Sequence, residues 1–190
     1  MKNIFIVSLG IVLVAVLLTV GKNANPTHKM TGGMEMEGHE HTMHEMMVTT
    51  DKEFLEGMIP HHEEAVATAN EVLARGTTPE VRVLAENIVA SQQAEIAIMK
   101  LWYKEITGTD YADAGLYTPM MRDLSTLSEI ALDKQFTEDM VMHHMGAIMM
   151  ANQLTSFSKN ENLLILAQEI IGAQKKEVEM MNGWLVTILK

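Results

Sequence analysis

Residues 140–152 read MVMHHMGAIMMAN, a stretch that places two adjacent histidines among five methionines. The same histidine pair occurs in residues 57–70, GMIPHHEEAVATAN. A shift of 82 positions aligns residues 51–106 with residues 133–188 without a gap, and 18 of the 56 aligned pairs are identical. Identity at this fixed spacing indicates an internal duplication, so both copies are expected to share one local structure.

Apolar residues recur with a helical period in both copies, which predicts two helices in each. In the first copy the helices are expected at residues 51–74 and 79–106, with Thr78 as N-cap and Pro79 at the first helical position. In the second copy the period breaks at FSKNEN, residues 157–162. Two such hairpins predict an all-α, ferritin-like four-helix bundle over residues 51–190. The connection, placed at residues 108–132, is long enough to cross the bundle, and the sequence leaves crossing and up-down-up-down topologies open.

The composition restricts the chemistry of the chain. Its 190 residues include 18 methionines, 8 histidines and no cysteine, which excludes disulfides, thiolate metal sites and cysteine nucleophiles. Any soft metal ligand must therefore be a methionine. The formal net charge of -11 favours metal ions and other cations as partners and argues against nucleic acid.

A hydrophobic segment precedes the repeats. After Lys2 the chain is apolar over residues 4–20, interrupted only by Ser8, Gly10 and Thr19, and then turns polar. We expect residues 1–22 to form a hydrophobic helix that is either an export signal or an uncleaved membrane anchor. Both interpretations predict an exported protein, in the periplasm or at the outer face of the cytoplasmic membrane. The anchor would contact the membrane through residues 4–20.

Residues 23–50 form a tail rich in histidine and methionine, without apolar periodicity. Four histidines and six methionines fall within residues 26–47, PTHKMTGGMEMEGHEHTMHEMM. Such a segment is expected to be disordered without a ligand, and its spaced donors indicate metal capture. A solvated linker of biased composition is the alternative. The candidate ligands of the tail are Met34, Met36, His39, His41, Met43 and His44.

The paired histidines are expected to meet inside the bundle. On a helical wheel both histidines of each pair flank the core stripe, and counting from the hairpin turns brings them to the depth of a glutamine and a glutamate on the following helix. A carboxylate on an apolar stripe needs a cation or a hydrogen-bond donor. The predicted polar layer comprises His61, His62, Gln92 and Glu95 from one copy and His143, His144, Gln174 and Glu177 from the other, bordered by Met58, Met99, Met140 and Met181.

This layer has two interpretations, metal coordination or a structural hydrogen-bond network. Four histidines and two glutamates would be a costly way to hold a bundle together, which favours coordination. Thioether and imidazole donors without thiolate indicate copper as Cu(I), whereas imidazole with carboxylate suits Cu(II), zinc or iron. The donors of the tail favour copper over zinc and iron.

The motifs resemble those of the bacterial domain of unknown function 305 family. The resemblance rests on Phe54-x3-Met58-Ile59-Pro60-His61-His62-x2-Ala65, on the counterpart that runs from Phe136 to Ala151, and on Gln-x2-Glu-x3-Met-x2-Trp in both second helices. It implies a ferritin-like bundle and, for some members, an exported copper-binding protein of copper resistance. The first copy departs from the second at Glu63-Glu64, where the second copy has Met145-Gly146.

We therefore predict an exported protein without catalytic turnover that sequesters copper or transfers it to another metal carrier or transporter. A ferritin-like metal oxidase is the alternative, with a dinuclear centre of the four histidines, Glu95 and Glu177. Against the oxidase, the chain lacks the Glu-x-x-His pair usual in such enzymes. A structural or interaction module with an inert core is the third interpretation.

Overall fold

Four α-helices make up the part of the chain that the structure describes, residues 47–190 of a computed structural model. They are α2 (Asp51–Arg75), α3 (Pro79–Thr107), α4 (Glu129–Phe157) and α5 (Glu161–Thr187), and no strand occurs among these residues. The predicted all-α four-helix bundle is confirmed. None of these helices combines the length and apolarity needed to cross a membrane. The predicted N-terminal helix and most of the tail, residues 1–46, lie outside the described residues.

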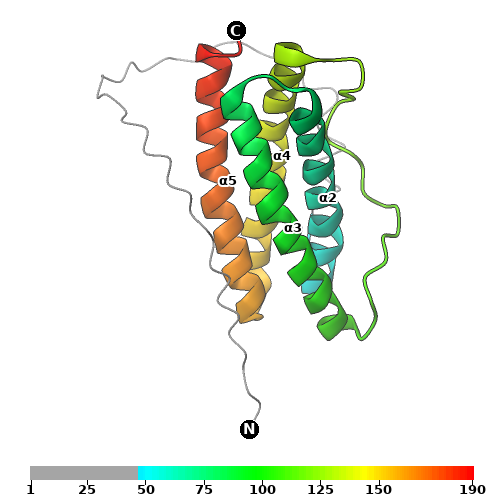
Figure 1. The fold of residues 1–190 in the computed structure, drawn as a ribbon. Helices are drawn as coiled ribbons and strands as arrows, with labels where there is room; N and C mark the ends of the chain where they lie inside the picture. Colours follow the sequence, from blue (N-terminus) through cyan, green and yellow to red (C-terminus); the bar gives the residue numbers. More distant parts are fainter. Residues whose placement is uncertain (1–46) are drawn as a thin grey trace, which may run out of the picture. The chain divides into compact units, whose positions relative to one another are not determined.

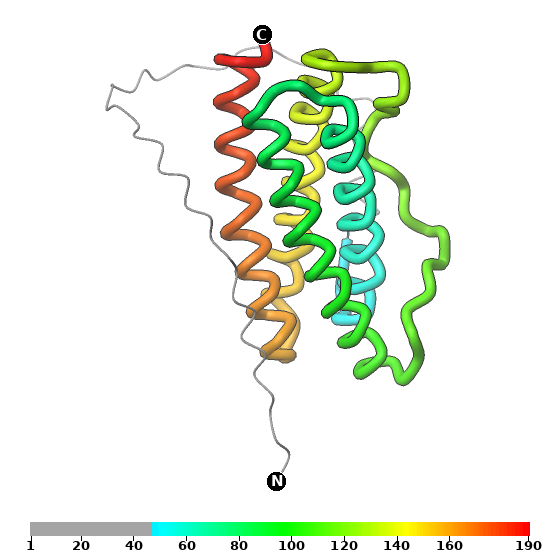
Figure 2. The backbone as a smooth tube through the Cα atoms, viewed as in Figure 1, coloured from blue at the N-terminus to red at the C-terminus, as the bar shows by residue number. Residues whose placement is uncertain are grey.

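The two hairpins are joined by a segment that crosses the bundle. Helices α2 and α3 form one antiparallel pair, and α4 and α5 form the other (Figure 1). The crossing segment, residues 108–128, runs along the outside of the bundle from the end of α3 to the start of α4 (Figure 2). Helix α2 therefore lies antiparallel to α4. This is the crossing topology of ferritin-like folds, one of the two that the sequence left open.

Helix α4 begins earlier than predicted. It starts at Glu129, with Ser128 as N-cap, whereas the second copy of the repeat starts at Asp133. The predicted connection of residues 108–132 was therefore wrong at its C-terminal end. The helix extends over this additional turn because Leu132 is fully buried in the apolar core. The bounds of the repeat show only where the two copies resemble each other in sequence. The start of α4 is set by the burial of its side chains and lies before the repeat begins.

The core consists of two apolar clusters separated by polar residues. One cluster contains Phe54, Met58, Met99, Leu154 and Leu163, among others, and the second contains Ala69, Ile88, Phe136, Met140 and Met181. Because α2 and α4 are antiparallel, the N-terminal half of each packs beside the C-terminal half of the other. On every helix, the residues of the predicted polar layer fall between the two clusters, at mid-bundle.

The crossing segment is fastened to the bundle at its C-terminal part. The guanidinium of Arg75, at the end of α2, donates to the carbonyl oxygens of Leu124 and Leu127. The backbone N–H and the guanidinium of Arg122 donate to the carboxylate of Asp139 on α4, at 3.0 and 2.7 Å. Leu124 is itself buried. The segment therefore has a fixed path beside α2 and α4.

The turn between α2 and α3 depends on a glycine and a buried aspartate. Asp133 of α4 accepts hydrogen bonds from the backbone N–H groups of Thr77 and Thr78 through Oδ2, at 2.9 and 2.6 Å. A Cβ atom at Gly76 would lie 2.2 Å from Oδ1 of Asp133 and 2.8 Å from the carbonyl oxygen of Val72. The two amides hold the carboxylate in place, so it cannot move away from an added methyl group.

Gly76→Ala is therefore expected to destabilise the protein by about 2 kcal/mol through overpacking. The backbone of Gly76, with φ -73° and ψ 154°, is one that alanine adopts readily, so the effect is steric. Urea unfolding measures it. Gly172→Ala is the matched control, since a Cβ there meets no atom within 4 Å and alanine should stabilise α5 by about 0.5–1 kcal/mol. Equal effects of the two substitutions would contradict this account of the turn.

Candidate metal centre

The four histidines of the repeats lie together in the middle of the bundle, and none of them is exposed to solvent. The ring of His61 on α2 and the ring of His143 on α4 have centroids 3.6 Å apart and planes inclined by 35°. The rings of His62 and His144 lie 6.2 and 6.4 Å from those of their sequence neighbours. The structure thus brings the imidazoles of both copies into one cluster. We call His61 and His143 the inner pair.

The other two histidines are each bound to a glutamate of their own hairpin. Nε2 of His62 lies 2.7 Å from Oε2 of Glu95, and Nε2 of His144 lies 2.6 Å from Oε2 of Glu177. The two carboxylates are 16% and 20% exposed. They lie at the edge of the polar layer, where the long side chain carries the charge outward to partial solvation. A carboxylate in this position fixes the orientation of its imidazole.

The inner pair lacks such partners. None of the four ring nitrogens of His61 and His143 has a hydrogen-bond partner, although all are buried. Nε2 of His143 is 3.2 Å from Oε2 of Glu64, but the contact does not have hydrogen-bond geometry. Buried polar atoms of this kind are rare because each costs about 1–3 kcal/mol. Their presence at the centre of the layer points to a ligand that uses them.

Burial keeps the inner pair neutral. Desolvation, followed by the nearby rings of His143 and His62, lowers the pKa of His61 well below its ordinary value. Desolvation, followed by the rings of His144 and His62, does the same to the pKa of His143. Each neutral imidazole has one nitrogen with a free lone pair. Both rings are therefore in the protonation state that binds a metal ion.

The stability of the metal-free protein is expected to fall as the pH drops below 6.5. In the unfolded chain both inner histidines titrate at their ordinary pKa of 6.5, and folding lowers both values. The unfolded state therefore takes up protons first, so this stability is fully present above pH 6.5 and is lost towards the lower, folded pKa values. Two such groups give a slope of up to about 2.7 kcal/mol per pH unit, at about 1.36 each.

Urea unfolding of the metal-free protein from about pH 7.5 to about pH 5.5 measures this slope. The control is a variant in which both inner histidines are replaced by leucine. This variant should lack the contribution of the pair and show a correspondingly flatter profile. A profile as steep as that of the native protein would assign the pH dependence to other groups.

The methionines predicted to border the layer are fully buried on both sides of it. Met58 and Met99 belong to one apolar cluster, and Met140 and Met181 belong to the other. The side-chain carbonyl oxygens of Gln92 and Gln174 are buried in the layer without partners. Within residues 47–190 no three histidine or acidic side chains converge so as to hold a metal ion. The donor types that the layer and its borders offer are imidazole nitrogen and thioether sulfur. The predicted tail ligands, residues 34–44, lie outside the described residues.

Two residues at this site, Glu64 and Tyr117, were missed by the sequence reasoning. The carboxylate of Glu64 accepts hydrogen bonds from the hydroxyl of Tyr117 at 2.6 Å and from the amides of Met120 and Met121 at 2.9 and 3.0 Å. The ring of Tyr117 lies edge-on to that of His61, with centroids 6.1 Å apart. Burial, followed by the bond to Glu64, raises the pKa of Tyr117, so the phenol remains a donor. The crossing segment thus covers the inner pair.

The sequence contains a signal for this contact. Glu64 corresponds to Gly146 in the second copy, so it is a position where the duplication is broken. The crossing segment covers only one side of the bundle, and a carboxylate that fastens it is needed in only one copy. Departures from the repeat therefore identify residues that serve the asymmetric part of the fold.

Comparison with known proteins identifies the family. A family model described as "Domain of unknown function (DUF305)" matches residues 15–103 and 111–188. The chain belongs to the DUF305 family. The two segments matched by the DUF305 model each contain one of the histidine pairs, in agreement with the duplication.

Solved structures of CopM resemble this DUF305 protein over most of its length. CopM in an Ag-bound form has a TM-score of 0.67 and 30% identity, and the match covers 74% of this chain and 98% of CopM. The Cu(I)-bound form has a TM-score of 0.65 and 32% identity, covering 72% and 96%. The Cu(II)-bound form has a TM-score of 0.64 and 32% identity, covering 73% and 97%.

A curated relative matches a shorter region. The uncharacterized protein L153 of Acanthamoeba polyphaga mimivirus is 44% identical to this DUF305 protein over 46 residues. The match covers 24% of this chain and 30% of the viral protein, so the chain spans less than a third of that protein's length.

Proposed function

We propose that this protein binds copper ions outside the cytoplasm and sequesters them or passes them to another metal carrier or transporter, without catalytic turnover. The proposal is carried by the inner pair, His61 and His143, whose ring nitrogens are buried without hydrogen-bond partners. A cation bound by the two lone pairs would offset the cost of burying them. In this role copper is cargo that enters and leaves the protein.

The donors at the layer favour copper over other metals. Zinc and iron sites usually assemble several imidazole and carboxylate ligands, whereas Cu(I) and Ag(I) accept thioethers and lower coordination numbers. The layer supplies imidazole donors from the four histidines and thioether donors from Met58, Met99, Met140 and Met181. In this proposal Glu95 and Glu177 orient His62 and His144 and do not bind the ion themselves. The Cu(I), Cu(II) and Ag complexes of CopM support this choice of metal.

The proposed route of the ion begins at the tail. Met34, Met36, His39, His41, Met43 and His44 would capture copper, which the bundle would then hold. The net charge of -11 raises the local concentration of cations. The apolar run of residues 4–20 is the basis for proposing export to the periplasm or retention at the outer face of the membrane.

The proposal is tested by elemental analysis of the full-length protein after desalting, together with competition against a Cu(I) chelator. We expect copper to remain bound in a stoichiometric amount. Added Cu(I) or Fe(II) under air should not be oxidised in excess of the ions bound. Protein that is free of copper after loading and desalting would refute the binding function, and sustained oxidation would identify an oxidase.

Deletion of residues 27–46 tests the contribution of the tail. The number of copper ions bound per chain should fall, because at least six donor side chains are removed. The melting temperature of the metal-free protein should not change, since the deleted segment ends before Val48, the first buried residue in the part of the chain that the structure describes. An unchanged number of bound ions would remove the tail from the proposed route.

A further inference from the structure

We propose that Met47, Met120 and Met150 form a separate binding site for a soft monovalent cation, of the class of Cu(I) and Ag(I). The site is a cavity of about 200 Å³ where the N-terminal segment joins the bundle. Its walls come from the start of α2, the C-terminal half of α4, the crossing segment and residues 47 and 48. This site goes beyond the proposed function and does not depend on the inner pair.

The three methionines that line the cavity come from three different parts of the chain. Met150 of α4 is almost completely buried, Met120 of the crossing segment packs against the same apolar cluster, and Met47 is 60% exposed. A Cβ atom at Gly57 of α2 would lie 3.4 Å from Sδ of Met150, so the backbone of α2 at this glycine lies close to the sulfur. Three thioethers in one small cavity form a donor set that selects soft cations.

The duplication shows that this cavity is particular to one side of the bundle. The positions that correspond to Gly57 and Met150 in the other copy are Asp139 and Thr68. Asp139 binds Arg122 of the crossing segment, so the equivalent place carries a carboxylate in an ion pair. The glycine and the thioether that form the cavity have no counterpart there.

Contacts of the N-terminal segment hold Met47 at the cavity. The backbone N–H of Val48 donates to Oε1 of Gln153 on α4 at 2.8 Å, and Val48 is 7% exposed. Nε2 of the same glutamine lies 3.6 Å from Sδ of Met47 and donates to it. Met47 is also the last residue of the histidine- and methionine-rich stretch of residues 26–47. Its sulfur thus contacts α4 through Gln153.

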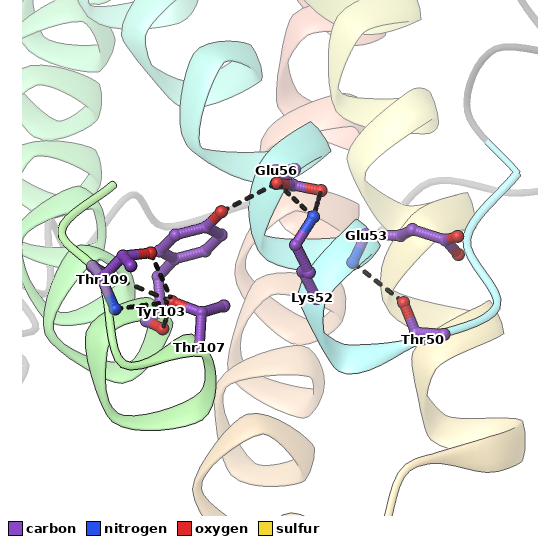
Figure 3. A network of polar contacts seen from close by, with 7 residues as sticks. All are labelled: Thr50, Lys52, Glu53, Glu56, Tyr103, Thr107 and Thr109. Atoms are coloured by element: carbon purple, nitrogen blue, oxygen red, sulfur yellow. Dashed lines mark hydrogen bonds and ion pairs between the residues drawn. The ribbon is translucent and has the colours of Figure 1, made fainter. Parts of the chain in front are cut away.

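Two carboxylates of α2, Glu53 and Glu56, line the cavity and give it a negative potential. Both carboxylates already accept hydrogen bonds. Glu56 accepts from Lys52 at 2.6 Å and from Tyr103 at 2.9 Å (Figure 3), and Glu53 accepts from the backbone N–H and the hydroxyl of Thr49 at 2.9 and 2.7 Å. The side chain of Thr49, followed by its backbone, lowers the pKa of Glu53 and keeps it ionised. The negative charge of these groups attracts a cation. Their oxygens already accept hydrogen bonds, so the methionine sulfurs are the donors left to bind it. Hard divalent ions, which prefer oxygen ligands, are therefore disfavoured.

The site adjoins the candidate metal centre. Tyr117 lines the cavity and also lies edge-on to the ring of His61. The phenol thus separates the thioether site from the inner pair. An ion at this site would be next to the polar layer but outside it, on the side where the crossing segment covers the histidines.

Silver titration of the full-length protein, labelled with ¹³C at its methionine methyl groups, tests the proposal in chloride-free buffer. Ag(I) is the probe because it is diamagnetic and does not change oxidation state under these conditions. We expect the methyl signals of Met47, Met120 and Met150 to shift together during the titration. If these three signals stay in place at saturating Ag(I), the proposal is overturned.

Leucine variants provide the second measurement. Met120→Leu combined with Met150→Leu should bind one Ag(I) fewer per chain, or bind it about tenfold or more weakly, since leucine has no donor atom. Met47→Leu should lower the affinity for the same ion. It cannot unfold the bundle, because Met47 is exposed. Met180→Leu, an exposed methionine of α5 outside the cavity, is the matched control and should bind silver as the native protein does. Unchanged silver binding by the double variant and by Met47→Leu would overturn the site.

Replacing both inner histidines by leucine separates this proposal from the function of the metal centre. The methyl signals of the three methionines should still shift in that variant, because none of the ligands of the thioether site has been removed. Loss of the shifts in the histidine variant would show that the methionines respond to the centre and have no site of their own.

Discussion

A protein that carries both His61→Leu and His143→Leu is expected to lose copper at the centre and to become more stable without metal. Both effects have one cause, since the inner pair buries four ring nitrogens that have no hydrogen-bond partner. Replacing such groups by apolar side chains of similar size is neutral or stabilising, and we expect a gain of about 2 kcal/mol. The affinity for Cu(I) should fall more than about 100-fold, because partners of ligands alone contribute 10- to 100-fold.

Chelator competition measures the affinity, and urea unfolding of the metal-free protein measures the stability. The matched control is His62→Leu combined with His144→Leu, which leaves Glu95 and Glu177 without their imidazole partners. This control should destabilise the protein, so the changes in the free energy of unfolding of the two double variants should have opposite signs. A loss of stability in the inner-pair variant would show that the pair holds the bundle together, and would support the structural interpretation of the layer.

Glu64→Ala is expected to destabilise the protein by about 3 kcal/mol. It should also detach the crossing segment from α2 where the segment covers the histidines. The carboxylate accepts from Tyr117 and from two backbone amides, and it is only 12% exposed. Hydrogen bonds to a charged group contribute about 1.5–3 kcal/mol each, and these three are not fully additive because they share one carboxylate. Urea unfolding gives the loss of stability, and hydrogen exchange at Met120 and Met121 should become faster.

The neighbouring residue provides the control for this prediction. Glu63 pairs with Lys100 at 2.6 Å, but both side chains are about 40% exposed. Glu63→Ala should therefore cost less than about 1 kcal/mol and leave exchange at residues 120 and 121 unchanged. If the two alanine variants unfold alike, Glu64 does not fasten the crossing segment.

Helical periodicity was sufficient to predict the bundle and the depth of its polar layer. Counting along the helices placed His62 at a similar height to Gln92 and Glu95, and the second copy gave the same match. The structure joins His62 to Glu95 and His144 to Glu177 by short hydrogen bonds. This works because the rise per residue is constant and the hairpin turns fix the register. The predicted metal ligands themselves stay a prediction.

Differences between the two histidines of a pair could not be predicted in this way. Both flank the core stripe at similar angles, so the sequence does not distinguish His61, which faces His143, from His62, which faces Glu95. The distinction depends on which helices are adjacent, and hence on the path of the crossing segment. The role of Glu64 depends on the same path, because its partners lie more than 50 positions away in the sequence.

The stacked inner pair takes one imidazole from each copy of the repeat. A hairpin on its own could form this stack only by associating with a second chain. Dilution would then dissociate the two chains and separate the rings. In this chain the covalent link makes the encounter intramolecular, so the effective concentration of one ring near the other is set by the chain and not by the amount of protein. The geometry of the centre is therefore maintained however scarce the protein is in its surroundings.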